Sequence, residues 1–235
     1  MNKELIEYTI DGNFFEGYLV SHDNKTPRPT VLISHAWSGL SGFEKQKAEE
    51  ISALGYNAFA IDMYGKGIRG NTLEENQKLM STLTEDRALL RHRIKAGLKA
   101  SQSLEAVDEN KIAAIGYCFG GLCVLDLARS GAPVKGVASF HGFFNPPEKL
   151  ANELIKAKII AFHGYDDPMV PPEEINKLAK EMNDAGVDWQ IHSYGLTYHA
   201  FTNPAAQDPA AGTVFSESGN RRSWETLKHF LTEIL

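Results

Sequence analysis

The sequence predicts an α/β fold with a mostly parallel sheet, an N-terminal antiparallel hairpin and helices on both faces. Short apolar runs alternate along the chain with longer segments of helical periodicity, which is typical of parallel strands joined by helical crossovers. The 235 residues, 43% of them hydrophobic, suit one globular domain with a substantial core. We therefore expect a single domain over residues 1–235, with functional side chains beyond the carboxyl ends of the strands.

The hairpin is predicted from Asp11-Gly12-Asn13, a turn signal between two strand-like runs. Its two strands, Ile6–Ile10 and Phe14–Val20, are expected at the edge of the sheet, and a polar loop follows over residues 22–29. The other predicted strands are buried and apolar: Thr30–Ser34, Asn57–Ile61, Ile112–Ile115, Gly136–Phe140, Lys158–Phe162 and Trp189–Ser193.

Helical spacing of apolar residues predicts the crossovers and the C-terminal helix. These segments are Phe43–Leu54, Leu73–Met80, Glu85–Ser101, Leu122–Ala128, a weak helix near Glu148–Leu154, Glu173–Asn183 and Arg221–Leu235. The glycine-rich stretch Asp62–Asn71 lacks the spacing of a phosphate-binding loop and is interpreted as a plain loop. Tyr194–Asn220 shows no periodic element, and a loop of that length is usually functional or mobile.

Cys118 is predicted at a sharp turn between a strand and a helix. Glycines in the segment GYCFGG, Gly116–Gly121, allow strand and helix to approach a residue with strained backbone angles. The helix N-terminus behind this residue favours a thiolate, so the turn both presents and activates a nucleophile. The pattern is that of a G-x-S-x-G nucleophile elbow with cysteine in place of serine. The alternative is a buried structural cysteine.

The second cysteine, Cys123, is expected in the core. If both cysteines lie on the elbow helix, a rise of about 7.5 Å separates them. That exceeds the separation of roughly 7 Å that a disulfide allows, so we expect both thiols to be free.

A thiol nucleophile needs a base and a group that orients the base. Asp167 follows the predicted strand Lys158–Phe162, and His199 follows the next strand, in the order acid then histidine that this chemistry uses on such sheets. Asp166 is the alternative orienting residue. His141 and His163 are interpreted as structural.

Three motifs together resemble the dienelactone hydrolase family of small single-domain α/β-hydrolases. The elbow at Gly116–Gly121 is similar to the family's cysteine motif, HGYDDPMVP at His163–Pro171 to its acid loop, and YHAF at Tyr198–Phe201 to its histidine loop. The resemblance covers nearly the whole chain and implies an α/β-hydrolase fold.

By the same resemblance the catalytic triad is Cys118, His199 and Asp167. The oxyanion hole would consist of the backbone N–H groups of Trp37 and Phe119, donors that stabilise charge which develops only in the transition state.

The sequence departs from the family pattern at two positions that handle substrate. Ala36 stands where the family commonly has a glutamate, and Asn203 stands where members that act on dienelactone place an arginine. Whether dienelactone itself is accepted is therefore open, with His35 and Arg69 as candidates to compensate. The expected pocket residues are His35, Ala36, Tyr64, Phe143 and Asn203. His35 has the alternative role of bonding backbone, and Trp37 and Phe144 are candidates for an aromatic wall.

These observations predict a hydrolase of small carboxylic esters or lactones that works through an acyl-enzyme and needs no metal or organic cofactor. Alternatives are an acyl-thioester hydrolase, which shares the triad, and a redox-sensing or ligand-binding protein on the same scaffold.

The expected partner is a small-molecule substrate. A net charge of −6 gives no basic face for nucleic acid or an anionic membrane. The N-terminal segment lacks the apolar core of a signal peptide, and no apolar run approaches membrane-spanning length. We expect a cytoplasmic protein, monomeric or a small homo-oligomer.

Overall fold

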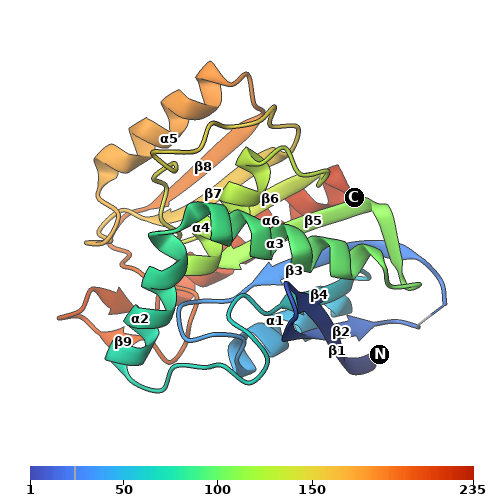
Figure 1. Ribbon diagram of the computed structural model, residues 1–235. Helices are drawn as coiled ribbons and strands as arrows, with labels where there is room; N and C mark the ends of the chain where they lie inside the picture. Colours follow the sequence, from blue (N-terminus) through green and yellow to red (C-terminus); the bar gives the residue numbers. More distant parts are fainter. Residues whose placement is uncertain (24) are drawn as a thin grey trace.

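The computed structural model describes residues 1–23 and 25–235, whose centre is an eight-stranded mixed sheet between two layers of helices (Figure 1). The strand order is β1-β2-β4-β3-β5-β6-β7-β8. The pairs β1·β2 and β2·β4 are antiparallel, and every other neighbouring pair is parallel. The strands are β1 (Asn2–Ile10), β2 (Asn13–Ser21), β3 (Arg28–Ser34), β4 (Asn57–Ile61), β5 (Val107–Tyr117), β6 (Gly136–Phe140), β7 (Lys158–Gly164) and β8 (Trp189–Tyr194). The predicted α/β fold is confirmed.

The expectation that both hairpin strands lie at the edge is wrong for one of them. β1 is the edge strand, whereas β2 lies between β1 and β4. The reason is the apolar C-terminal half of β2, in which Leu19 and Val20 pack into the hydrophobic clusters on opposite faces of the sheet. This buried half pairs with β4 over Tyr18–Val20, so its backbone groups are hydrogen-bonded where water cannot reach them.

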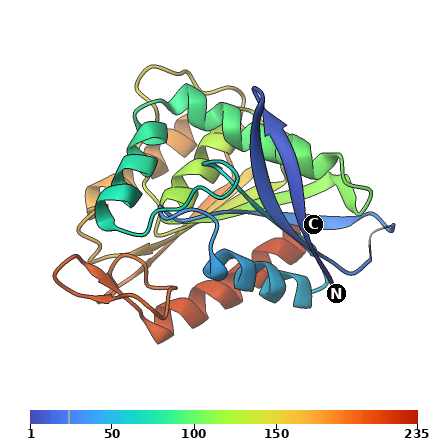
Figure 2. The ribbon, with the colours of Figure 1, turned by 60° about the horizontal axis from the view of Figure 1, so that its bottom comes forward.

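Helices cover the two faces of the sheet unequally. α2 (Leu73–Thr84), α3 (Arg87–Gln102), α4 (Phe119–Arg129) and α5 (Pro172–Asp184) contribute to one apolar cluster, and α1 (Gly42–Ala53) and α6 (Glu217–Ile234) to the other. Figure 2 shows α1 and α6 side by side on the same face. Adjacent residues of β3 serve opposite faces, since Leu32 packs under α3 and α4 while Ile33 faces the other layer.

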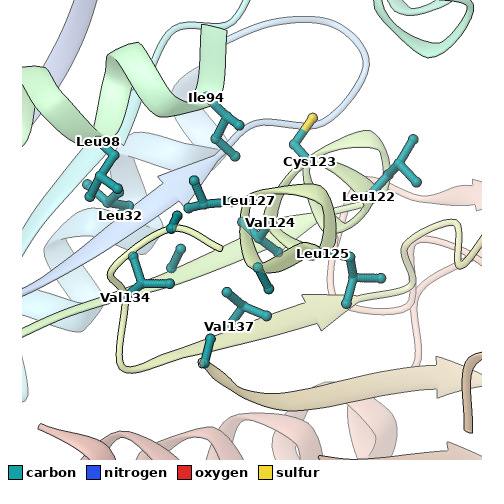
Figure 3. Packing of buried hydrophobic residues seen from close by; sticks show 14 of the residues in the cluster. Leu32, Ile94, Leu98, Leu122, Cys123, Val124, Leu125, Leu127, Val134 and Val137 are labelled. Carbon is teal, nitrogen blue, oxygen red and sulfur yellow. The ribbon is translucent and has the colours of Figure 1, made fainter. Parts of the chain in front are cut away.

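Cys123 lies in the larger cluster, as predicted. Its side chain packs beside Leu122 and Ile94 in the contact between α4 and α3 (Figure 3). Both cysteines of the chain are free thiols, in agreement with the expectation from helical rise.

Strand, elbow and helix meet through direct backbone contact. A Cβ atom added to Gly116 would lie 2.0 Å from the carbonyl oxygen of Gly120, and one added to Gly120 would lie 2.1 Å from that of Ser34. These two positions therefore admit only glycine, because a side chain would separate β5, α4 and β3. The close approach sets the position of residue 118 relative to the end of β3.

The weak helix predicted near Glu148–Leu154 is absent, and backbone groups of this segment bond to α3 and α4: the Ala151 carbonyl accepts from Arg91, and the N–H of Glu153 donates to the Arg129 carbonyl (2.8 Å). Arg129 donates to the carbonyl of Phe144 (2.6 Å), and Arg91 donates to that of Ala151 (3.0 Å). Arg129 also bonds to the buried carboxylate of Asp126 (3.3 Å), and Arg91 lies 3.9 Å from the same carboxylate. Carbonyls that are bonded across to other elements are not available for the i to i−4 bonds of a helix.

Residues 194–220 contain more structure than the sequence indicated. β9 (Gln207–Asp208) and β10 (Thr213–Val214) form an antiparallel pair, and α6 begins at Glu217 instead of the predicted Arg221. Ser216 caps α6 by accepting a hydrogen bond from the N–H of Gly219. The backbone of His199 bonds to Gly212 and Val214, so the small hairpin braces the histidine loop.

Within residues 1–23 and 25–235, none of the helices has both the length and the apolar character that crossing a membrane requires.

We predict that Gly120→Ala lowers the free energy of unfolding by about 3 kcal/mol, because the new methyl group overlaps the Ser34 carbonyl. Urea denaturation measures the change. The control is Gly42→Ala, at the first residue of α1 with open space around it, which we expect to change stability by less than about 1 kcal/mol. Equal effects of the two substitutions would contradict the close-approach argument.

Candidate active site

Cys118 occupies the tip of the turn between β5 and α4. Its backbone has φ +56° and ψ −118°, a strained region for a residue with a side chain. The turn is held by its N–H, which donates to the carbonyl of Phe140 (3.0 Å), and by its carbonyl, which accepts from Gly121 (2.9 Å). The side chain is partly exposed. The fold thus holds a strained residue with its thiol accessible at the carboxyl end of the sheet.

His199 and Asp167 form a buried hydrogen-bonded pair. His199 Nδ1–H donates to Asp167 Oδ2 over 2.7 Å, and both side chains are almost fully buried. The other carboxylate oxygen, Oδ1, accepts from the N–H of Met169 (2.8 Å). Asp166, the alternative from the sequence, is exposed. The structure therefore brings the histidine together with Asp167 and not with its neighbour.

The second ring nitrogen of His199, Nε2, is buried and has no partner of strict hydrogen-bond geometry among the described residues. Burial lowers the pKa of His199, but the negative charge of Cys118 and the hydrogen bond to Asp167 outweigh it and raise the pKa to about 10. The interaction of the His199 ring with Cys118 is thus mainly electrostatic. This balance favours the protonated form of the His199 ring.

Two further groups surround the His199 ring. The His141 ring contacts it edge-on with centroids 5.0 Å apart, and Phe143 lies 6.0 Å away. His141 Nε2 bonds to the hydroxyl of Thr202 (2.9 Å). Burial and the charge of His199 hold the pKa of His141 well below its ordinary value. A neutral His141 next to a charged His199 agrees with the structural role expected for it.

Trp37 and Phe119 lie on either side of Tyr64. The Tyr64 hydroxyl donates to the carbonyl of Trp37 (2.9 Å), and its ring stacks on Phe119 with centroids 5.8 Å apart. Burial, followed by the charges of the two cysteines, raises the pKa of Tyr64. Phe119 is the first residue of α4, so its N–H has no acceptor within the helix. Tyr64 is therefore part of the wall that links the two expected N–H donors.

The other pocket candidates are less available to a substrate than expected. Both ring nitrogens of His35 bond to backbone groups, Nδ1 to the carbonyl of Ala36 (2.6 Å) and Nε2 to the N–H of Met63 (3.0 Å). Of the two roles considered for His35, the structure supports the backbone one. Asn203 Oδ1 accepts from the N–H of Ala205 (3.0 Å), so this side chain closes a turn.

Two more expectations need correction. Arg69 Nε donates to the carbonyl of Leu40, and its guanidinium lies 3.9 Å from buried Asp62. It is therefore held by the protein and is not a free cation for a substrate carboxylate. Phe144 is 2% exposed and packs in the core near His163, so it forms no part of an aromatic wall.

Glu44 was missed as a site residue. It lies on α1, and its buried carboxylate accepts from the N–H of Ala36 (3.1 Å) and from the N–H and hydroxyl of Ser41 (2.8 and 2.6 Å). The signal was present in the sequence: Ser41 and Glu44 have the S-x-x-E spacing of a capping box.

Hollows elsewhere on the surface are separate from the candidate active site. Two of them, of about 400 and 440 Å³, lie between the N-terminal half of α3 and the segment 145–153. Neither contains Cys118, Asp167 or His199, so their size carries no information on the chemistry.

Comparison with known proteins agrees with the geometry. The family profile "Dienelactone hydrolase family" matches residues 15–235. An uncharacterised protein of Caenorhabditis elegans is 35% identical over 155 residues, 64% of this chain and 98% of that protein. The carboxymethylenebutenolidase of Pseudomonas putida is 23% identical over 214 residues, 88% of each chain. The crystal structure of the dienelactone hydrolase-like promiscuous phosphotriesterase P91, from metagenomic libraries, superposes with a TM-score of 0.93 at 31% identity, covering 99% of this chain and 98% of that one.

We predict that Cys118→Ser lowers the pKa of His199 from about 10, because it removes the charge that does most to raise it while burial still opposes protonation. The wild-type ring stays protonated up to the higher pH. An NMR titration of the imidazole nitrogens measures both values. An unchanged pKa in the variant would show that His199 does not interact with the thiolate.

Proposed function

The chain belongs to the dienelactone hydrolase family, hydrolases that act on ester or lactone bonds, and we propose that Cys118 is its nucleophile, His199 its acid–base catalyst and Asp167 the residue that orients His199. The observation that supports this best is the buried His199–Asp167 hydrogen bond of 2.7 Å. It directs the other nitrogen of the ring toward a cysteine held in a strained elbow.

In the first half of the proposed reaction, the Cys118 thiolate attacks the carbonyl carbon of the ester. The carbonyl oxygen becomes negatively charged and accepts hydrogen bonds from the N–H groups of Trp37 and Phe119. The tetrahedral intermediate collapses, its carbon–oxygen bond breaks, and His199 gives its proton to the departing alkoxide. The products are an alcohol and an acyl thioester on Cys118. With a lactone, both ends of the substrate stay attached at this stage.

In the second half, His199 takes a proton from water, and the hydroxide attacks the thioester carbonyl. The same N–H groups stabilise the second oxyanion, and the carbon–sulfur bond breaks to release the carboxylic acid. The thiolate and the protonated His199 are restored. Asp167 keeps Nδ1 protonated throughout, so Nε2 carries out every transfer.

The substrates we propose are small esters or lactones without a carboxylate that must be held by an arginine. The Asn203 side chain has no charge and closes a turn, and Arg69 bonds to Leu40. We therefore expect dienelactone, which carries a carboxylate, to be a weaker substrate than a neutral ester of similar size.

We predict that Cys118→Ala lowers kcat/KM for a short-chain 4-nitrophenyl ester by at least about 10³-fold, because no thiolate remains to form the acyl-enzyme. Nitrophenolate release measures the rate, and an acyl thioester in the same assay tests the thioesterase alternative. Wild-type turnover by the variant would contradict the proposal.

The two adjacent aspartates provide a matched control for this experiment. Asp167→Asn should lower kcat by about 10²–10⁴-fold, because the amide no longer selects the required tautomer of His199. Asp166→Asn changes an exposed side chain beside the site and should leave the rate within about twofold. The reverse pattern would assign the orienting role to Asp166.

A second candidate activity is hydrolysis of phosphotriesters, favoured by the likeness over the full chain to the promiscuous phosphotriesterase P91. The same thiolate would attack phosphorus, the phosphoryl oxygen would occupy the oxyanion hole, and an aryloxide would leave. Water would then break the phosphorus–sulfur bond.

We predict that wild-type protein releases 4-nitrophenolate from diethyl 4-nitrophenyl phosphate and that Cys118→Ala does not. A burst of one equivalent per protein chain would show that water attack is the slow step. Equal release by wild type and the variant would exclude this route.

A further inference from the structure

The loop after β3 has an unusual pattern of backbone hydrogen bonds at Ala36 and Trp37. The N–H of Ala36 donates to Glu44 (3.1 Å), and the carbonyl of Trp37 accepts from the Tyr64 hydroxyl (2.9 Å). The carbonyl of Ala36 accepts a short bond from His35 Nδ1 (2.6 Å) and a longer one from the N–H of Gly39 (3.2 Å). Over the described part of the chain, no acceptor bonds to the fourth group, the N–H of Trp37. Three of four neighbouring polar groups are thus fixed, and the fourth is available.

The partners of His35 determine its tautomer. The N–H of Met63 can only donate, so Nε2 accepts and carries no proton. The carbonyl of Ala36 can only accept, so Nδ1 carries the proton. The side chain is fully buried, and burial lowers its pKa against the opposing charge of Glu44. The neutral ring therefore satisfies both contacts in a single orientation.

Planarity of the peptide bond transmits this orientation to the proposed oxyanion hole. The carbonyl of Ala36 and the N–H of Trp37 belong to the same peptide unit and point in opposite directions. A hydrogen bond that fixes the carbonyl also fixes the N–H. It polarises the peptide unit as well, which makes the N–H a stronger donor.

We propose that His35 is a positioning residue of the oxyanion hole, which directs the Trp37 N–H at the developing oxyanion through its Nδ1–H bond to the Ala36 carbonyl. This inference rests on the proposed function, since it takes the Trp37 N–H as an oxyanion donor. His35 itself touches no substrate, because both of its nitrogens are bonded inside the protein. Glu44 and Tyr64 hold the backbone groups on either side of the same peptide unit.

Two substitutions of His35 each remove one of the two hydrogen bonds of its ring and retain the other. In His35→Asn the amide nitrogen lies near the position of Nδ1 and retains a donor for Ala36. In His35→Gln the amide oxygen reaches the position of Nε2 and retains an acceptor for Met63, but the Ala36 carbonyl loses its short bond from the ring and keeps only the longer one from the N–H of Gly39 (3.2 Å). Each variant keeps one bond and loses ring volume, so thermal unfolding should place their stabilities close together.

The expected result is a selective loss of ester chemistry. His35→Gln should lower the acylation rate constant for the 4-nitrophenyl ester by about 10–100-fold with KM within about threefold, a smaller effect than full removal of an oxyanion donor. His35→Asn should stay within about threefold of wild type. Alkylation of Cys118 by iodoacetamide forms no oxyanion, so its rate should be unchanged within about twofold in both variants.

Other results would overturn the inference. Equal loss of acylation in the two variants, or a parallel loss of alkylation, would show that His35 only stabilises the fold. A different result would overturn the proposed function itself. If Cys118→Ala kept its turnover, Cys118 would not be the nucleophile, whatever the His35 variants show. If Cys118→Ala were inactive while His35→Gln acylated normally, only the present inference would fail.

Tyr64→Phe provides a test that does not depend on the folding of the His35 variants. It removes the hydroxyl that holds the Trp37 carbonyl and keeps the aromatic ring against Phe119. We expect slower acylation with unchanged alkylation. The inference would be overturned if Tyr64→Phe acylated at the normal rate and the two His35 variants had equal acylation rates. The same conclusion would follow if Tyr64→Phe acylated normally and neither His35 variant folded.

Discussion

The backbone contact between β3, β5 and α4 is the constraint from which the rest of the site follows. Gly116 and Gly120 allow carbonyl groups to lie where side chains would otherwise stand. This approach places the elbow residue, Cys118, and the first turn of α4 against the end of β3. The two segments that carry the proposed nucleophile and the proposed N–H donors therefore form one rigid unit.

The pKa values of His199 and His141 shift in opposite directions although the two buried rings are in contact. The charge of Cys118 and the bond to Asp167 favour a protonated His199 against the effect of burial. His141, in edge contact with the same ring, is held neutral by burial and by that charge. A second imidazolium at this position would repel the first, and this repulsion adds to burial in lowering the pKa of His141.

Side chains from helices hold irregular backbone in two places, the segment after β6 and the loop after β3. Arg91 and Arg129 bond carbonyls of the segment after β6, and Arg129 is itself bonded to Asp126. Glu44 bonds the loop after β3 in the same manner. Loops fixed in this way keep donors and rings in place without being helices or strands themselves, which suits a site that needs orientation more than motion.

The sequence alone determined the fold class, the order in which the candidate catalytic residues follow the strands, and the elbow. It could do so because hydrophobic periodicity and glycine spacing are local properties. It favoured Asp167 with Asp166 as the alternative, gave His35 two possible roles, and predicted a helix near residue 148. Those questions depended on tertiary contacts: which carboxylate faces His199, which groups bond both nitrogens of His35, and which arginines take the carbonyls after β6. Partners far apart in the chain decide such contacts, and no local pattern encodes them.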